Sequence, residues 1–157
     1  MLSYLKKIKV RPYFKKIIPL LVAHGAGPVV LSDDFHFVID TILHSNGIKG
    51  ITVCANRLRF CDDRLIPAFP HTNLRCWKCG HCKTKNLKKR GIGSKIIIYI
   101  GDGRSDICPA KKADLVFAKG SLLKYFRQNR LECKPFKDLK EVYNYFKRIY
   151  DAEPKDR

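Results

Sequence analysis

The stretch "KIIIYIGDGRSD", residues 95–106, decides the fold expected for this chain. Its isoleucine-rich first half is typical of a buried strand, and Gly101 and Gly103 let the backbone turn sharply and approach a ligand closely. Asp102 and Asp106 stand four residues apart at that turn. Because ligands gather at the carboxyl ends of parallel strands, the stretch predicts a metal or phosphate site at the end of a strand.

Helical patterns and short apolar strands alternate along the rest of the chain. We expect strands at residues 29–32, 51–60, 64–69, 95–100 and 114–118, and helices at 12–23, 33–47, 86–90, 105–112, 121–129 and 137–150. Asp33 and Asp34 are expected to open the second of these helices, because carboxylates stabilise the positive end of a helix. The alternation predicts an α/β fold, with a Rossmann-like parallel sheet and flanking helices. The turn "CDD" between strands 51–60 and 64–69 predicts a β-hairpin.

Length and charge narrow the class of protein. A chain of 157 residues with 45% hydrophobic residues is most simply one folded domain. We expect a single core over residues 1–150, a hairpin and cysteine-rich insertion over 61–83 within it, and a polar tail over 151–157. The 32 Lys and Arg residues against 14 Asp and Glu residues give a net charge of +18, which attracts polyanions and phosphorylated substrates. Residues 64–101 contain no acid.

The compartment expected for this chain is the cytoplasm. A basic segment followed by "IIPLLVA" imitates a secretory signal, but Pro19 interrupts the apolar run. No apolar stretch reaches the length needed to span a bilayer, so no membrane partner is expected. Seven cysteines, three of them clustered at a metal-like spacing, suit a reducing compartment better than a disulfide scaffold.

Four segments together resemble a known family. They are "VVLS" at 29–32, "VCANRLRF" at 53–60, "CGHCK" at 79–83, and "YIGDGRSDICPAKKADLVFAKGSLLKYFRQN" at 99–129. In this order they are similar to the haloacid dehalogenase superfamily, within its phosphoserine phosphatase-like branch, and above all to the 2-hydroxy-3-keto-5-methylthiopentenyl-1-phosphate phosphatases. The resemblance implies a phosphatase that acts on a small phosphorylated metabolite with the help of Mg²⁺.

The resemblance also implies a role for four residues. Ser32 would hydrogen-bond the phosphoryl group, and Lys83 would neutralise its charge and the charge that develops during its transfer. Asp102 would ligate Mg²⁺, and Asp106 would support Asp102 from the second shell. Lys85, Lys88 and Lys89 are alternatives for the lysine, and Lys83 is preferred because it directly follows "CGHC".

One part of the family's pattern is missing. The family attacks phosphate with an aspartate of a "DxD" motif on its first strand, and no "DxD" occurs in this sequence. We therefore expect a sheet without the central nucleophile strand, and a truncated or catalytically incomplete phosphatase that is inactive alone. Three outcomes are open for the sheet: strands 29–32 and 95–100 pair directly, another chain supplies the strand, or the chain is a fragment that lacks an N-terminal segment and folds poorly alone. We also expect self-association, because an open apolar strand edge recruits other strands.

The cysteine cluster is a second candidate site. Cys76, Cys79 and Cys82 follow the spacing C-x₂-C-x₂-C, and with His71 or His81 they could hold tetrahedral Zn²⁺. The cluster supports an alternative function: a non-catalytic, zinc-containing basic module that binds RNA or another polyanion. Phosphate binding that depends on Asp102 would favour the phosphatase, whereas nucleic-acid binding with a steep salt dependence would favour the alternative.

Overall fold

The structure is a computed structural model that describes residues 2–62, 64–74, 79–91, 93 and 95–152. Its strands are β1 (Val29–Phe35), β2 (Thr52–Cys61), β3 (Arg64–Ala68), β4 (Ile98–Gly101), β5 (Leu115–Ala118) and β6 (Lys134–Pro135). Its helices are α1 (Leu2–Leu5), α2 (Phe14–Ala23), α3 (His36–Ser45), α4 (Lys83–Arg90), α5 (Ile107–Ala110), α6 (Gly120–Gln128) and α7 (Leu139–Ala152). A 3₁₀ turn, Arg104–Asp106, lies between β4 and α5. The predicted α/β class is confirmed.

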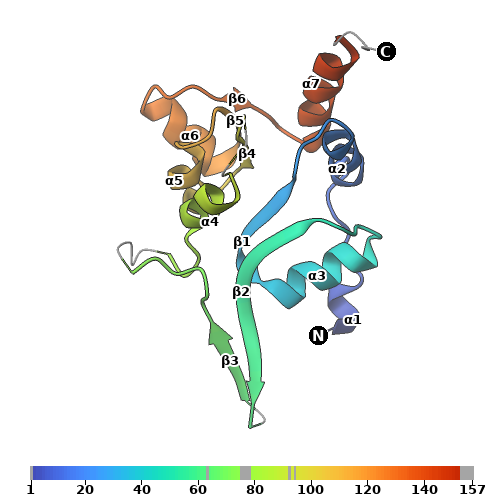
Figure 1. Cartoon of the computed structure of the whole chain (residues 1–157), viewed down its shortest axis with the longest axis vertical. Helices are drawn as coiled ribbons and strands as arrows, with labels where there is room; N and C mark the ends of the chain where they lie inside the picture. Colours follow the sequence, from blue (N-terminus) through green and yellow to red (C-terminus); the bar gives the residue numbers. More distant parts are fainter. Residues whose placement is uncertain (1, 63, 75–78, 92, 94, 153–157) are drawn as a thin grey trace.

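The strands form two separate sheets of three (Figure 1). In the first, β1 pairs with β2 in parallel, and β2 pairs with β3 as the antiparallel hairpin expected from the turn. In the second, β4, β5 and β6 are all parallel. Within the described residues, β1 pairs only with β2 and β4 pairs only with β5, so one edge of each is unpaired. The described residues place no further strand beside β1 or β4.

The core packs mainly around the second sheet. One cluster of buried side chains lies between β4, β5, α4, α5 and α6 and consists of Leu87, Tyr99, Ala110, Val116, Ala118, Leu122 and Phe126. A second cluster joins β5 to α2 and α7 and consists of Ile17, Phe117, Phe136, Val142 and Phe146. Burial of large aromatic and aliphatic side chains is the main favourable term in folding. These clusters therefore fix β4, whose carboxyl end carries the predicted site.

Two predicted boundaries were wrong in a way that affects the site. Asp33 and Asp34 do not open a helix, because β1 continues to Phe35 and α3 begins at His36. The Asn56 side chain donates a hydrogen bond to the Asp33 carbonyl at 2.8 Å, and Phe35 pairs with Asn56 across the sheet, so the backbone stays extended. Likewise α4 begins at Lys83 instead of residue 86.

Smaller differences lie elsewhere in the chain. The fourth strand begins at Ile98, and the short strand β6 was not predicted. The helix expected at 105–112 is split into the 3₁₀ turn and α5. α7 continues to Ala152, two residues into the segment that was expected to be a polar tail.

Candidate functional site

The carboxylate of Asp106 is the centre of a buried hydrogen-bonded group at the end of β4. Its Oδ1 accepts hydrogen bonds from Lys83 Nζ at 2.8 Å and from the Tyr99 hydroxyl at 2.9 Å. Its Oδ2 accepts from the backbone N–H groups of Asp102 at 3.0 Å and Gly103 at 2.9 Å. Four donors occupy the lone pairs of a carboxylate. Asp106 therefore fixes the turn that carries Asp102. Its own carboxylate supports this turn and is not open to a metal.

Lys83 connects the end of β4 with the end of β1. Its ammonium group lies 2.8 Å from the Asp106 carboxylate, 3.0 Å from the Ser105 hydroxyl and 3.3 Å from the carboxylate of Asp33. The lysine side chain is only 9% exposed, whereas the three alternative lysines of α4 are more exposed. Lys83 is thus the lysine of this helix that lies beside the Gly101–Asp106 turn.

The charges of this group stabilise one another. Burial works to lower the pKa of Lys83, but the hydrogen bond and charge of Asp106, together with Asp33, outweigh it and the pKa is raised. Burial works to raise the pKa of Asp106, but its bonds from Lys83 and Gly103 prevail and the pKa is lowered. Burial, and then the charge of Asp106, raise the pKa of Tyr99. At neutral pH the lysine is therefore cationic, Asp106 anionic and Tyr99 a neutral donor.

Asp102 has a fixed backbone and an accessible carboxylate. Its carbonyl accepts hydrogen bonds from the Leu122 N–H at 3.2 Å and the Ser121 hydroxyl at 3.1 Å. Its side chain is 59% exposed, and Lys119 Nζ lies 4.0 Å from its Oδ2. A hard cation such as Mg²⁺ needs oxygen ligands of this kind. Asp102 fits the role of one such ligand, but no three His, Cys, Asp or Glu side chains of the described residues lie together as a metal site.

Ser32 is held by a local contact. Its hydroxyl accepts a hydrogen bond from the backbone N–H of Asp34 at 3.2 Å. Among the described residues of β1, Asp33 forms an ion pair with Lys83, and Ser32 forms no hydrogen bond with it. The sequence reasoning missed Asp33 because it placed that residue in a helix, although its position at the end of an apolar strand was an available signal.

Two buried polar atoms near this group lack partners among the described residues. They are Oδ1 of Asn56 and Nδ1 of His81. The Asn56 amide binds the Asp33 backbone, and the charges of Asp33 and Lys83 both act on His81. Burial, and then the charge of His71, lower the pKa of His81 to about 4. His81 also contacts the Asn86 amide through its other ring nitrogen, Nε2, at 3.1 Å.

The cysteine cluster gains no support as a zinc site. Cys76 lies outside the described residues, and Cys79 and Cys82 form no cluster of three metal ligands with the other described side chains. Cys82 Sγ accepts a long contact of 3.9 Å from the Asn73 amide, and the His71 ring packs against the His81 ring at 4.8 Å. Burial and four bases, Arg57 first, lower the pKa of His71. A positive field of this kind disfavours a further cation.

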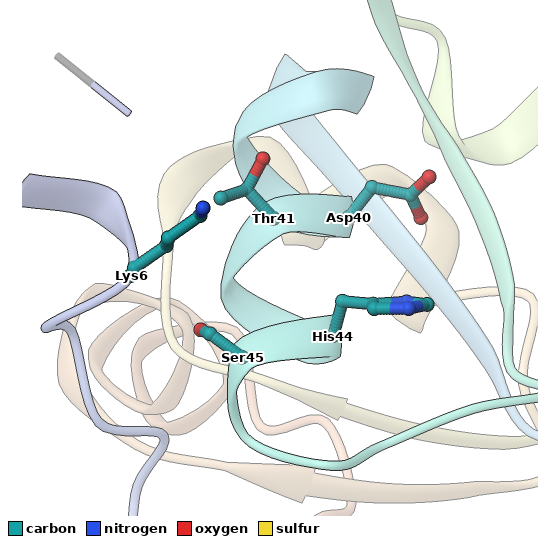
Figure 2. Close-up of a pocket in the computed structure, with 5 residues that line it drawn as sticks. All are labelled: Lys6, Asp40, Thr41, His44 and Ser45. Carbon is teal, nitrogen blue, oxygen red and sulfur yellow. The ribbon is translucent and has the colours of Figure 1, made fainter. Parts of the chain in front are cut away.

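A hollow in the described structure is lined by residues other than those of this group. It has a volume of about 440 Å³ and is lined by Lys6, Asp40, Thr41, His44 and Ser45 (Figure 2). Asp40 and His44 point to one side of α3, whereas Lys6 approaches Thr41 on the other, so the polar groups do not converge. The candidate site is therefore at the strand ends.

No described helix is both long and apolar enough to cross a membrane.

Comparison with known proteins identifies a family for this chain. The family model described as "Putative Phosphatase" matches residues 1–132, and these residues include Asp33, Lys83, Asp102 and Asp106. The chain belongs to this family. The resemblance to a family of phosphatases, expected from the sequence, is thereby confirmed.

Two curated relatives of this chain have the same name. The 2-hydroxy-3-keto-5-methylthiopentenyl-1-phosphate phosphatase of Bacillus velezensis is 27% identical over 95% of this chain and 64% of its own length. The protein of the same name from Exiguobacterium sibiricum is 28% identical over 87% of this chain and 63% of its own. The chain thus spans less than two thirds of these relatives.

Solved structures share the fold. A phosphoserine phosphatase with a phospho-aspartyl intermediate analogue superposes with a TM-score of 0.67 at 24% identity, covering 91% of this chain and 67% of that one. An apo phosphoserine phosphatase gives a TM-score of 0.64 at 24% identity, covering 91% and 70%. At this level of identity the comparison establishes the arrangement of helices and strands.

Proposed function

We propose that this chain positions a phosphoryl group for a Mg²⁺-dependent phosphatase reaction on a small phosphorylated metabolite. The observation that carries the proposal is the buried Lys83–Asp106 pair, which fixes the turn bearing Asp102 and places the lysine beside Asp33. Phosphoryl transfer depends mainly on positioning and on stabilising charge, and a rigid cation beside an accessible carboxylate serves both needs.

The residues divide this work between them. Lys83 would neutralise phosphoryl oxygens, and Gly101 and Gly103, which carry no side chain, would let the phosphate approach the turn closely. Asp102 would hold a magnesium ion, which when bound screens the negative charge of the phosphate. Ser32 is proposed to donate a hydrogen bond to the phosphoryl group, which requires its hydroxyl to be shared with the Asp34 N–H.

The attacking carboxylate is proposed to come from outside the described strands. In the resembled family an aspartate oxygen attacks phosphorus, the alkoxide of the ester leaves with a proton from an acid, and water then hydrolyses the aspartyl phosphate. β1 and β4 each have an unpaired edge in the described structure. A strand between them, from a further segment or another chain, would bring such a carboxylate to the end of β4.

The cysteine content supports a reducing, cytoplasmic setting.

Binding of orthovanadate or inorganic phosphate tests the proposal without requiring turnover. We expect the purified chain to bind either anion more tightly when Mg²⁺ is added, as measured by ³¹P NMR for phosphate and by calorimetry for vanadate. Asp102→Asn should remove the effect of Mg²⁺, while Asp151→Asn, the same change of charge on exposed α7, should leave it intact. Equal binding with and without Mg²⁺ by both variants would refute the proposed site.

A further inference from the structure

The β2–β3 hairpin has two chemically different faces. In its register Arg57 lies opposite Ala68, Arg59 opposite Ile66, and Cys61 opposite Arg64. Directly opposed residues share a face and alternate residues return to it, so the three arginines lie along one face of the ribbon, together with Cys61, Ile66 and Ala68. All three are exposed. The other face carries apolar side chains, which include Leu65 and Pro67.

The exposed side of α4 continues this positive charge. Lys85, Lys89 and Arg90 of α4 are exposed, and their charges act together with that of Arg57 on His71, so the base of the hairpin and the helix are neighbours. None of the ion pairs among the described residues involves these bases. We call this group the basic surface; it consists of Arg57, Arg59, Arg64, Lys85, Lys89 and Arg90.

We propose that the basic surface binds the phosphodiester backbone of a nucleic acid. Arg57 and Arg59 are two residues apart on β2, about 6.8 Å along the strand, so they can contact different phosphates of one polynucleotide. Guanidinium groups bind phosphate in a bidentate manner. A two-stranded β-ribbon also fits the major groove of DNA.

The arrangement of the hairpin argues against an anionic membrane as the partner. Leu65, which is 51% exposed, lies on the opposite, apolar face, whereas Ile66, which is 46% exposed, shares the face of the arginines. A hairpin that buried this apolar face in a bilayer would direct its arginines away from the lipid head groups. The hairpin extends away from α5, α6 and the second sheet, so either face is accessible to a long polymer (Figure 1).

Fluorescence anisotropy with a labelled 20-base-pair duplex and a labelled 20-nucleotide single strand tests this inference. The test variant combines Arg57→Gln, Arg59→Gln and Arg64→Gln. The control combines Arg127→Gln, Arg130→Gln and Arg148→Gln, which removes the same charge from exposed positions elsewhere. We expect the test variant to bind at least ~10-fold more weakly and to lower the salt slope for the duplex by about 3, with the control close to the unmodified chain.

Three results would overturn the inference. They are no binding of either nucleic acid at 50 mM salt, equal losses in the test and control variants, and binding to phosphatidylserine vesicles without binding to nucleic acid. The basic surface excludes Lys83 and Asp102, so nucleic-acid binding should persist in Asp102→Asn. A negative result for nucleic-acid binding would therefore leave the proposed phosphatase function unaffected.

Discussion

Lys83 and Asp106 come from segments 23 residues apart and form the most buried ion pair of the described structure. The sequence could predict both residues, because the glycine turn and the lysine after "CGHC" follow a known order. It could not predict Tyr99 or Asp33 as their partners. The face of the sheet on which the Tyr99 side chain lies, and the residue at which the strand containing Asp33 ends, both depend on packing. Asp33 was misplaced for that reason, since two acids before an apolar stripe are equally typical of a helix start.

Lys83→Met should destabilise the chain strongly. The change leaves the Asp106 carboxylate buried without its cation, which typically costs about 3 kcal/mol or more in the free energy of unfolding. Lys88→Met, at an exposed position of the same helix, should cost less than about 0.5 kcal/mol. Urea denaturation of the two variants measures the difference. Equal midpoints would mean that the ion pair does not support the fold.

The stability should also depend on pH at both extremes. The pKa of Asp106 is lowered, so its contribution is complete above its unfolded value of about 3.9 and is lost as the pH falls through the folded pKa. The pKa of Lys83 is raised, so its contribution is complete below about 10.4 and is lost as the pH rises through the folded pKa. The raised pKa of Tyr99 adds to the alkaline loss. Asp106→Asn should flatten the acid limb of the curve, and an unchanged acid limb would contradict the assignment.

At the scale of elements, the turn after β4 depends on one glycine more than on the other. A Cβ at Gly101 would lie 2.9 Å from Asp106 Oδ2 and 2.9 Å from Tyr99 Cε1, whereas a Cβ at Gly103 would lie 3.4 Å from Asp106 Oδ2. The sequence predicted that both glycines allow a sharp turn, but it could not show which of them is less tolerant of a side chain. The difference arises because the Asp106 side chain folds back over the end of the strand, a contact that only the three-dimensional structure gives.

Gly101→Ala should therefore disturb the site, and Gly103→Ala should not. The added methyl group at Gly101 has to displace the Asp106 carboxylate or the Tyr99 ring, at a cost of about 1–3 kcal/mol. The same methyl group at Gly103 meets an ordinary contact on an extended backbone. Thermal unfolding and phosphate binding of both variants check this. A Gly103→Ala defect as large as that of Gly101→Ala would show that the turn, not the carboxylate contact, is the sensitive feature.

At the scale of the whole molecule, the fold class and the hairpin could be predicted from alternation and turn residues, but the division into two sheets needed the family resemblance. β1 and β4 both run to the candidate site, and neither has a described partner on its inner edge. Unpaired backbone groups in an interior cost about 1–3 kcal/mol each. Several of them would rival the stability of a domain of this size, about 5–15 kcal/mol. We propose that this chain holds the groups that position a phosphate, and that the carboxylate that attacks it lies elsewhere.

The most direct test of this account is the steady-state release of phosphate from p-nitrophenyl phosphate by the purified, monomeric chain in the presence of Mg²⁺. Lys83 can position a phosphate but cannot replace the attacking carboxylate, so we predict no turnover above the buffer rate. Turnover that requires Mg²⁺ and disappears in Asp102→Asn would contradict the account. It would mean that a carboxylate of this chain attacks phosphorus, and Asp33, 3.3 Å from Lys83, would be the first residue to replace by asparagine.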